Sequence, residues 1–148
     1  MSALGRIFRS VESSLPLTAK PDDASKSWIY PNGTVMPLFI ETYRGTLGPT
    51  DCDELGHMHV QHYFAAVSNG MFGIMSRLGL TPEEIQRRQM SFAIVHAETD
   101  FHRELHSGDV MLLESTVLKL GDKSATFQHR LKNLSTDIVA MTTLSACY

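Results

Sequence analysis

The sequence has 148 residues, of which 43% are hydrophobic and 20% charged, and a formal charge of −3; these values are typical of one soluble globular domain. Nucleic-acid-binding proteins usually carry a basic surface, so this charge argues against such a partner. No apolar run approaches the roughly 18 residues of a membrane-spanning helix, and we expect no membrane association. Cys52 and Cys147 match no zinc or redox spacing, so we expect free thiols and a cytoplasmic protein.

Residues 1–35 differ in composition from the rest of the chain. Residues 1–15 place apolar side chains at helical spacing together with two arginines, which predicts a short docking helix or, alternatively, an organelle presequence. Residues 16–35 are rich in turn-forming types and predict an extended arm, which Trp28 and Tyr30 would anchor to the body or to a partner. We therefore divide the chain into an N-terminal helix and arm, residues 1–35, and a folded domain, residues 36–148.

The folded domain begins with β-forming residues and then changes to helical periodicity. Residues 37–47 predict a strand. Within residues 50–80, apolar side chains recur every three or four positions, which predicts one long amphipathic helix. Gly70 and Gly73 lie inside this helix, where glycine is unfavourable unless another backbone passes very close. Gly79 predicts the C-cap.

A short polar helix and four strands are predicted to follow. Thr81 and Pro82 form a typical helix start, with a capping hydroxyl and a proline at the first helical position. Beyond this helix, hydrophobic and polar residues alternate in segments joined by tight connections, as in β-strands. The predicted strands cover residues 92–101, 110–120, 124–132 and 138–148.

The predicted elements indicate an α+β fold in which an antiparallel sheet of about five strands packs against one long helix. We expect residues 92–101 to form a half-buried strand with polar groups on one side. We place the last strand at an edge of the sheet, unless the sequence is a piece of a longer chain.

Candidate catalytic groups gather at the start of the long helix. Asp51 and Asp53 precede His57, and the first helical turn offers unpaired N–H groups that favour negative charge. A carboxylate that attacks or activates water, with such an N–H as oxyanion donor, would suit hydrolysis of an acyl group. The two aspartates could instead only cap the helix or a turn. The sequence contains neither a G-x-S-x-G elbow nor a glycine-rich phosphate loop.

Three closely spaced histidines raise the question of a metal site. His57, His59 and His62 lie near Asp51 and Asp53, and imidazoles with a carboxylate suit zinc. The helix is expected to start inside this triplet, so the three side chains should point in different directions. We therefore expect no metal ligands and no cofactor.

The segment GPTDCDELGHMHVQHYFAAVSNG resembles the signature region of hot-dog-fold acyl-CoA thioesterases of the 4-hydroxybenzoyl-CoA thioesterase type. Their pattern is roughly Asp-x-Asp-x-x-Gly-His-x-Asn followed by a helix containing Tyr. The residues that match it are Asp51, Asp53, Gly56, His57 and Tyr63. The segments AETDFHRELHSGD and LGDKS also resemble the family, so the similarity covers about residues 37–148. It implies a hot-dog fold, an antiparallel sheet wrapped around the long helix.

The resemblance also implies roles for particular residues. Asp53 would be the catalytic base or nucleophile, and a backbone N–H near Val60 would stabilise the oxyanion, with His57 and His59 beside them. Contacts to the substrate, including the phosphates of coenzyme A, would come from Tyr63, Lys123, Ser124 and Arg130.

One position departs from the family pattern. His59 stands where the family usually has Asn, and a histidine is larger and titrates near neutral pH. The departure therefore affects the local geometry and the pH dependence expected of the site. A related subgroup carries its catalytic acid on the long helix, but residues 57–78 contain no Asp or Glu, which argues against that subgroup.

We therefore expect an acyl-CoA thioesterase that hydrolyses an acyl- or aroyl-CoA to the free acid and CoA. The resemblance implies a homodimer or homotetramer with the active site at the subunit interface, lined in part by residues 92–101 of a partner chain. A hot-dog enoyl-CoA hydratase or dehydratase that moves a proton through His57, and a non-catalytic acyl-CoA-binding module, stay as alternatives. Phe64, Met71 and Phe72 indicate only that the surroundings of the helix are apolar.

Overall fold

The computed structural model describes residues 39–120 and 123–148. The helix and arm predicted within residues 1–35 lie outside the described residues. The described elements follow the predicted order of one strand, two helices and four strands. They are β1 (Ile40–Thr46), the short 3-10 turn η1 (Pro49–Asp51), α2 (Val60–Arg77), α3 (Pro82–Arg87), β2 (Ile94–Phe101), β3 (Val110–Leu120), β4 (Ala125–Asn133) and β5 (Val139–Cys147).

The strands form one five-stranded antiparallel sheet in the order β1-β3-β4-β5-β2. The α+β arrangement predicted from the sequence is therefore confirmed. The last strand, β5, lies inside the sheet between β4 and β2, so its predicted position at an edge is wrong. It pairs on both sides because β2, formed earlier in the chain, lies beside it. None of the described helices combines the length and apolar character that a membrane crossing requires.

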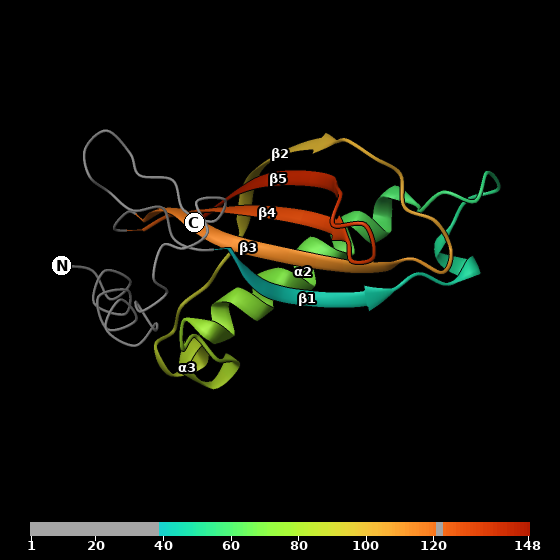
Figure 1. Cartoon of the computed structure of the whole chain (residues 1–148). Helices are drawn as coiled ribbons and strands as arrows, with labels where there is room; N and C mark the ends of the chain where they lie inside the picture. The colour runs from blue at the N-terminus through green and yellow to red at the C-terminus, as the bar shows by residue number, and fades with distance from the viewer. Residues whose placement is uncertain (1–38, 121–122) are drawn as a thin grey trace, which may run out of the picture.

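The long helix α2 lies across one face of the sheet and packs against β1, β3 and β4 (Figure 1). Two glycines allow this close approach. A Cβ built at Gly73 would lie 2.2 Å from the carbonyl oxygen of Thr42, and one built at Gly70 would lie 2.2 Å from Cδ2 of Leu113. A side chain at Gly73 would push the helix away from the sheet, because the atom that it meets belongs to the backbone. The prediction that another backbone passes very close is confirmed at Gly73, whereas the nearest neighbours of Gly70 are the side chains of Leu113 and Thr42.

The ends of the helices also follow the sequence. Gly79 has a φ of +76°, which suits glycine at the position after a helix. The N–H of Leu80 then donates to the carbonyl oxygen of Met75 at 2.9 Å. At the start of α3, Oγ1 of Thr81 accepts the N–H of Glu84 at 3.3 Å. Both the C-cap and the capping threonine were predicted.

A row of polar side chains crosses the buried face of the sheet. Ser115, His129 and Thr143 stand opposite one another on β3, β4 and β5, and all three are buried. Oγ of Ser115 lies 2.7 Å from Oγ1 of Thr42 and 2.7 Å from Nδ1 of His129. Oγ1 of Thr143 lies 2.5 Å from Oγ1 of Thr99 on β2. We call these five residues the polar row.

The polar row separates two apolar clusters of the core. Phe127, with the C-terminal half of α2, belongs to one cluster, and Leu131, with the N-terminal half of α2, belongs to the other. His129 lies between them with Nε2 buried and without a hydrogen-bond partner in the described part of the chain. Burial lowers the pKa of His129 to about 4, because the charged imidazolium is costly where water is excluded.

Strand β2 is exposed along nearly its whole length. The prediction of a half-buried strand is therefore wrong for the single chain. The reason is that α2 packs mainly against β1, β3 and β4 and reaches β2 at Phe101, through the rings of Tyr63 and Phe64. Ile94, Val95 and Phe101 are exposed apolar side chains on this strand. A bare strand edge with apolar side chains is a template for pairing with another chain.

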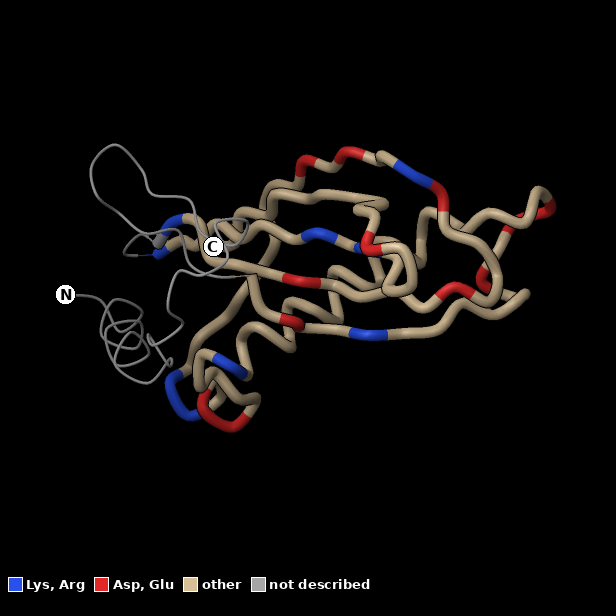
Figure 2. Tube along the Cα trace, in the orientation of Figure 1, with Lys and Arg blue, Asp and Glu red and all other residues tan. Residues whose placement is uncertain are grey.

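Charged residues are distributed unevenly between the two ends of the sheet (Figure 2). Acidic residues gather around η1 and the loop that follows it, where α2 begins. Lys119 and Lys123 lie at the opposite end, where β3 leads into β4. The two ends therefore offer different electrostatic surroundings to a charged ligand.

Candidate active site

The residues between η1 and α2 fold into a compact loop that holds Asp53. Oδ2 of Asp51 accepts the N–H of Gly48 at 2.7 Å. The carbonyl oxygen of Asp51 accepts the N–H of His59 at 2.9 Å. Gly56 has a φ of +82°, a conformation that glycine adopts without strain. These contacts fix both ends of the loop and turn the chain back toward its start.

Asp53 is held by the backbone of its own loop. Its Oδ1 accepts the N–H of Leu55 at 2.9 Å and the N–H of His57 at 3.0 Å. These hydrogen bonds, chiefly the one from His57, keep the pKa of Asp53 below its usual value, because they favour the charged carboxylate. In the part of the chain that the structure describes, Oδ2 accepts no hydrogen bond. The geometry thus combines an ionised carboxylate with one unoccupied oxygen.

The start of α2 supplies backbone donors close to this loop. His59 occupies the N-cap position without a side-chain capping bond, and its N–H is already bonded to Asp51. The N–H groups of Val60 and Gln61 have no acceptor among residues 39–120 and 123–148. Such N–H groups carry the partial positive charge of a helix start. The N–H of His59 is therefore occupied, whereas that of Val60 is free to donate to a ligand.

Neither aspartate caps α2, but both bond backbone groups in the loop. Asp51 binds the N–H of Gly48, and Asp53 binds those of Leu55 and His57. The alternative in which the aspartates cap a turn is thus partly realised. If Asp53 takes part in a reaction, it does so through Oδ2, because Oδ1 is occupied by the loop backbone.

The side chain of His57 lies beside residues that follow β2. Its Nε2 lies 3.1 Å from Oε2 of Glu104, and its ring meets that of His106 edge-on at 5.2 Å between centroids. The sequence analysis did not anticipate Glu104 or His106 beside the loop. The alternation of Glu104, Leu105 and His106 was visible, but nothing in the sequence showed which segment they would face.

The three histidines considered as metal ligands are not brought together. His57 faces Glu104, whereas Nε2 of His62 lies 3.7 Å from Oδ1 of Asp51. His59 is exposed at the N-cap. As predicted, the start of the helix inside the triplet turns the side chains in different directions.

Tyr63 lies beneath the loop and is only 5% exposed. Its hydroxyl oxygen accepts the N–H of Leu105 at 3.3 Å, and its ring meets Phe101 edge-on at 5.2 Å. Burial is the main cause of the raised pKa of Tyr63. Tyr63 therefore holds the segment around Leu105 in place and presents little surface to a substrate in the single chain.

Two of the residues predicted to contact coenzyme A, Lys123 and Ser124, lie far from Asp53 within one chain. Lys123 and Ser124 begin the return from β3, a strand of 11 residues that spans about 35 Å, whereas the Asp53 loop lies at the other end of the sheet (Figure 1). Nε of Arg130 lies 2.6 Å from Oε2 of Glu114 on the neighbouring strand. A second chain would be needed to bring such residues to Asp53.

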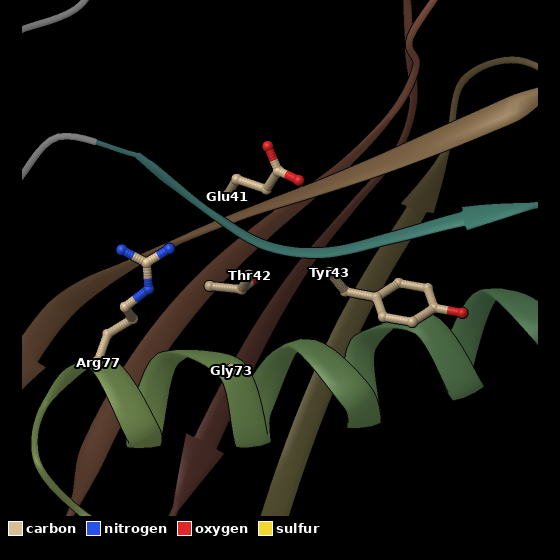
Figure 3. Close-up of a pocket in the computed structure, with 5 residues that line it drawn as sticks. All are labelled: Glu41, Thr42, Tyr43, Gly73 and Arg77. Atoms are coloured by element: carbon tan, nitrogen blue, oxygen red, sulfur yellow. The ribbon is translucent and has the colours of Figure 1, made fainter.

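A pocket of about 390 Å³ lies between β1 and α2. Figure 3 shows Thr42 and Tyr43 on the strand above Gly73, with the guanidinium of Arg77 reaching up toward the strand that carries Glu41. None of the predicted site residues lines it. This pocket is therefore distinct from the candidate active site.

Residues 47–148, which include the Asp53 loop, α2 and strands β2 to β5, match the family model described as the thioesterase-like superfamily. The chain belongs to this superfamily. The family predicted from the signature segment is thereby confirmed, whereas the finer 4-hydroxybenzoyl-CoA type stays a prediction.

Individual members of the superfamily resemble the chain over part of its length. A 1,4-dihydroxy-2-naphthoyl-CoA hydrolase from Prochlorococcus marinus is 30% identical over 82 residues, which are 50% of this chain and 54% of that protein. The match therefore spans about half the length of that relative.

Solved structures extend the comparison to the fold. The 1,4-dihydroxy-2-naphthoyl-CoA thioesterase of Synechocystis is 17% identical, with a TM-score of 0.62 over 71% of this chain and 79% of that chain. A Staphylococcus aureus protein in complex with CoA is 18% identical, with a TM-score of 0.67 over 75% of this chain and 70% of that chain. At these identities the likeness concerns the fold alone, and the hot-dog fold is confirmed.

Proposed function

We propose that this member of the thioesterase-like superfamily hydrolyses the thioester of an acyl- or aroyl-CoA to the free acid and CoA. The observation that carries the proposal is the geometry of Asp53. Two backbone N–H groups hold its Oδ1 and keep it ionised, while Oδ2 is free beside the start of α2. The name of the Prochlorococcus relative, a 1,4-dihydroxy-2-naphthoyl-CoA hydrolase, supports an aromatic acyl group as one candidate.

The proposed reaction uses one carboxylate oxygen and one backbone donor. Oδ2 of Asp53 either attacks the thioester carbonyl carbon or removes a proton from the water that does so. The N–H of Val60 stabilises the negative charge that develops on the carbonyl oxygen. The C–S bond then breaks, CoA leaves as the thiolate and takes up a proton, and water supplies the oxygen of the acid. Either role of Asp53 requires the ionised form.

We also propose that two copies of the chain assemble through the edge formed by β2. Its exposed apolar side chains support pairing with a second copy. If two β2 strands paired antiparallel, the partner's sheet would run in the opposite direction to that of the first chain. The end of that sheet with Lys123 and Ser124 would then lie at the same end as the Asp53 loop. This arrangement would let a partner chain supply the predicted coenzyme A contacts.

The test is an assay of wild type and Asp53→Asn against a panel of acyl- and aroyl-CoAs, with release of free thiol followed over time. We expect the wild type to release thiol, and Asp53→Asn to be slower by roughly 10²- to 10⁴-fold, the range for loss of a positioned acid or base. Wild type that releases no thiol from any substrate would contradict the proposal, as would full activity in Asp53→Asn.

Two alternatives are tested in the same experiment. The pairing of His57 with Glu104 at 3.1 Å is also suited to moving a proton, as a hydratase or dehydratase acting next to the thioester carbonyl would require. That activity would be favoured if wild type removed the absorbance of an enoyl-CoA without releasing thiol and if His57→Ala no longer did so. Binding of CoA esters without turnover would favour a non-catalytic module.

We propose a reducing compartment such as the cytoplasm as the place of action. Cys52 and Cys147 are both free thiols, as predicted, and free cysteines are typical of proteins in a reducing environment. Alkylation of the native protein in cells, followed by mass spectrometry of Cys52, would reveal an oxidised thiol if the location were different.

A further inference from the structure

Three side chains with metal-binding donor atoms meet beside the Asp53 loop. The donor atoms of His57, Glu104 and His106 all lie within 4.8 Å of one another. Nε2 of His57 lies 3.1 Å from Oε2 of Glu104. The three residues come from two segments about 47 positions apart in the sequence, so their meeting is a product of the fold. We call them the His-Glu-His cluster.

Backbone pairing determines that the three side chains share one face. His57 and His106 form an antiparallel bridge, and directly opposed residues in such a pair project to the same side. Glu104 lies two positions before His106, which places it on that same side because side chains alternate along an extended chain. The N–H of Met58 donates to the carbonyl oxygen of Leu105 at 2.7 Å, which ties the two segments together.

The opposite face of these segments is anchored in the core. Met58 is 5% exposed and Leu105 is 1% exposed. The N–H of Leu105 also donates to the hydroxyl oxygen of Tyr63 at 3.3 Å. The backbone beneath the His-Glu-His cluster is therefore held from the inside, while Glu104 and His106 are exposed and His57 is half-buried.

We propose that the His-Glu-His cluster binds a divalent cation of the zinc class. Two imidazole nitrogens and one carboxylate oxygen are donors that zinc takes, and three protein ligands leave a coordination position for water or another ligand. Ligand atoms around tetrahedral zinc lie roughly 3.5 Å apart, given bond lengths of about 2.1 Å. Small rotations of exposed side chains bring atoms now within 4.8 Å to that separation.

A neighbouring carboxylate holds one of the proposed ligands. Oδ2 of Asp109 accepts the backbone N–H of His106 at 2.8 Å and lies 3.9 Å from Nδ1 of the same residue. The hydrogen bond fixes the backbone that carries the imidazole, whereas 3.9 Å is too long for a hydrogen bond to the ring itself. Asp109 is thus a positioning residue for the His-Glu-His cluster.

The test is direct metal binding by the full chain, purified without a histidine tag and stripped with a chelator. Zn²⁺ is titrated in competition with a chromogenic indicator, and Co²⁺ is added separately to record its visible spectrum. We expect one Zn²⁺ per chain and a Co²⁺ spectrum of low coordination number. Glu104→Gln and His106→Asn should each weaken Zn²⁺ binding by roughly tenfold or more. Asp109→Ala, which leaves the N–H of His106 without this acceptor, should weaken it by a smaller factor.

The matched control is His62→Asn, which removes an imidazole from the adjacent helical turn without touching the cluster. It should leave Zn²⁺ affinity unchanged. Wild type that binds Zn²⁺ no more tightly than the double variant Glu104→Gln/His106→Asn would overturn the proposal. An equal loss of affinity in His62→Asn would overturn it too, because the imidazoles at the helix start would then be the ligands. Neither measurement depends on whether the chain hydrolyses thioesters.

Discussion

The backbone N–H of His57 donates to Oδ1 of Asp53 at 3.0 Å, and the backbone N–H of Asp53 donates to the carbonyl oxygen of His57 at 2.8 Å. Two residues four positions apart are thereby joined in both directions, which closes the loop before α2. The side chain proposed for the chemistry is therefore also part of the structure that positions it. Substitutions of Asp53 should separate these two roles.

Asp53→Asn and Asp53→Ala should both lose thioester hydrolysis but should differ in stability. The amide oxygen of Asn can still accept the N–H groups of Leu55 and His57, whereas Ala leaves both donors without that partner. We expect a lower thermal midpoint for Asp53→Ala than for Asp53→Asn by differential scanning calorimetry. Glu54→Ala, an exposed neighbour, serves as the control. Equal midpoints for the two Asp53 variants would show that the loop does not depend on these hydrogen bonds.

Tyr63→Phe should destabilise the fold with little effect on catalysis. The change removes the hydroxyl that accepts the N–H of Leu105 at 3.3 Å and leaves a buried donor unpaired. We expect a loss of about 1–2 kcal/mol in the free energy of unfolding, measured with urea. KM for the best acyl-CoA should change little. A large rise in KM with unchanged stability would instead support the direct substrate contact that the sequence predicts for Tyr63.

Gly73→Ala should weaken the packing of α2 on the sheet. The added Cβ would lie 2.2 Å from the carbonyl oxygen of Thr42, and a backbone atom cannot move aside as a side chain can. We expect destabilisation of about 2 kcal/mol, since the cost of overpacking exceeds the gain in helix propensity of about 1 kcal/mol. Asn69→Ala, on the exposed face of the same helix, should be neutral or slightly stabilising. Gly73→Ala that unfolds at the same urea concentration as wild type would contradict the close approach.

His129→Leu should make the fold less sensitive to acid. In the folded chain the pKa of His129 is lowered from 6.5 to about 4, so between these values the unfolded chain binds a proton that the folded chain does not. Stability from this residue is complete above pH 6.5 and is lost as the pH falls toward 4. The loss amounts to about 3 kcal/mol.

Urea unfolding at pH 7 and at pH 5 measures this effect. We expect the free energy of unfolding to fall less in His129→Leu than in wild type over that interval. His102→Leu is the control, because His102 is an exposed histidine. Wild type and His129→Leu that lose stability in parallel would show that His129 does not titrate as its burial requires.

Val95→Lys should disrupt the assembly proposed for β2. Val95 is 64% exposed on the sheet edge, and a lysine there would place a charge in the middle of a strand pair. Sedimentation velocity should show a dimer or larger assembly for wild type and a shift toward monomer for Val95→Lys. Ile138→Lys changes a side chain of similar exposure, 50%, outside β2, and should leave the assembly intact. If the wild type were a monomer, the proposal that two chains share one active site would be wrong.

The elements of the fold could be predicted because their signals are local. The apolar spacing of α2, the capping hydroxyl of Thr81 and the glycine after α2 each depend on neighbours within a few positions. The exposure of β2 could not be predicted in this way. The alternation along residues 92–101 is typical of a half-buried strand, but which strands α2 covers depends on the order of strands in the sheet.

In the candidate site, too, the features with a local sequence signal could be predicted and those that depend on distant segments could not. The signature segment identified Asp53 and the start of α2, which lie within eight positions of each other in the sequence. Glu104 and His106 reach His57 only through pairing with a distant segment, and no local pattern reveals that pairing. The predicted contacts of Lys123 and Ser124 require a second chain to approach Asp53, and no local pattern in the sequence encodes how two chains pack.

The polar row has a consequence for how the strands find their partners during folding. If β4 slipped by two positions against β3 and β5, every apolar side chain would still face α2, so hydrophobic burial alone would not oppose the error. The slip would, however, move His129 out of line with Ser115 and Thr143 and bury polar groups against hydrocarbon. The polar row thus favours the native register of the strands, because that register leaves the fewest buried polar groups without a hydrogen-bond partner.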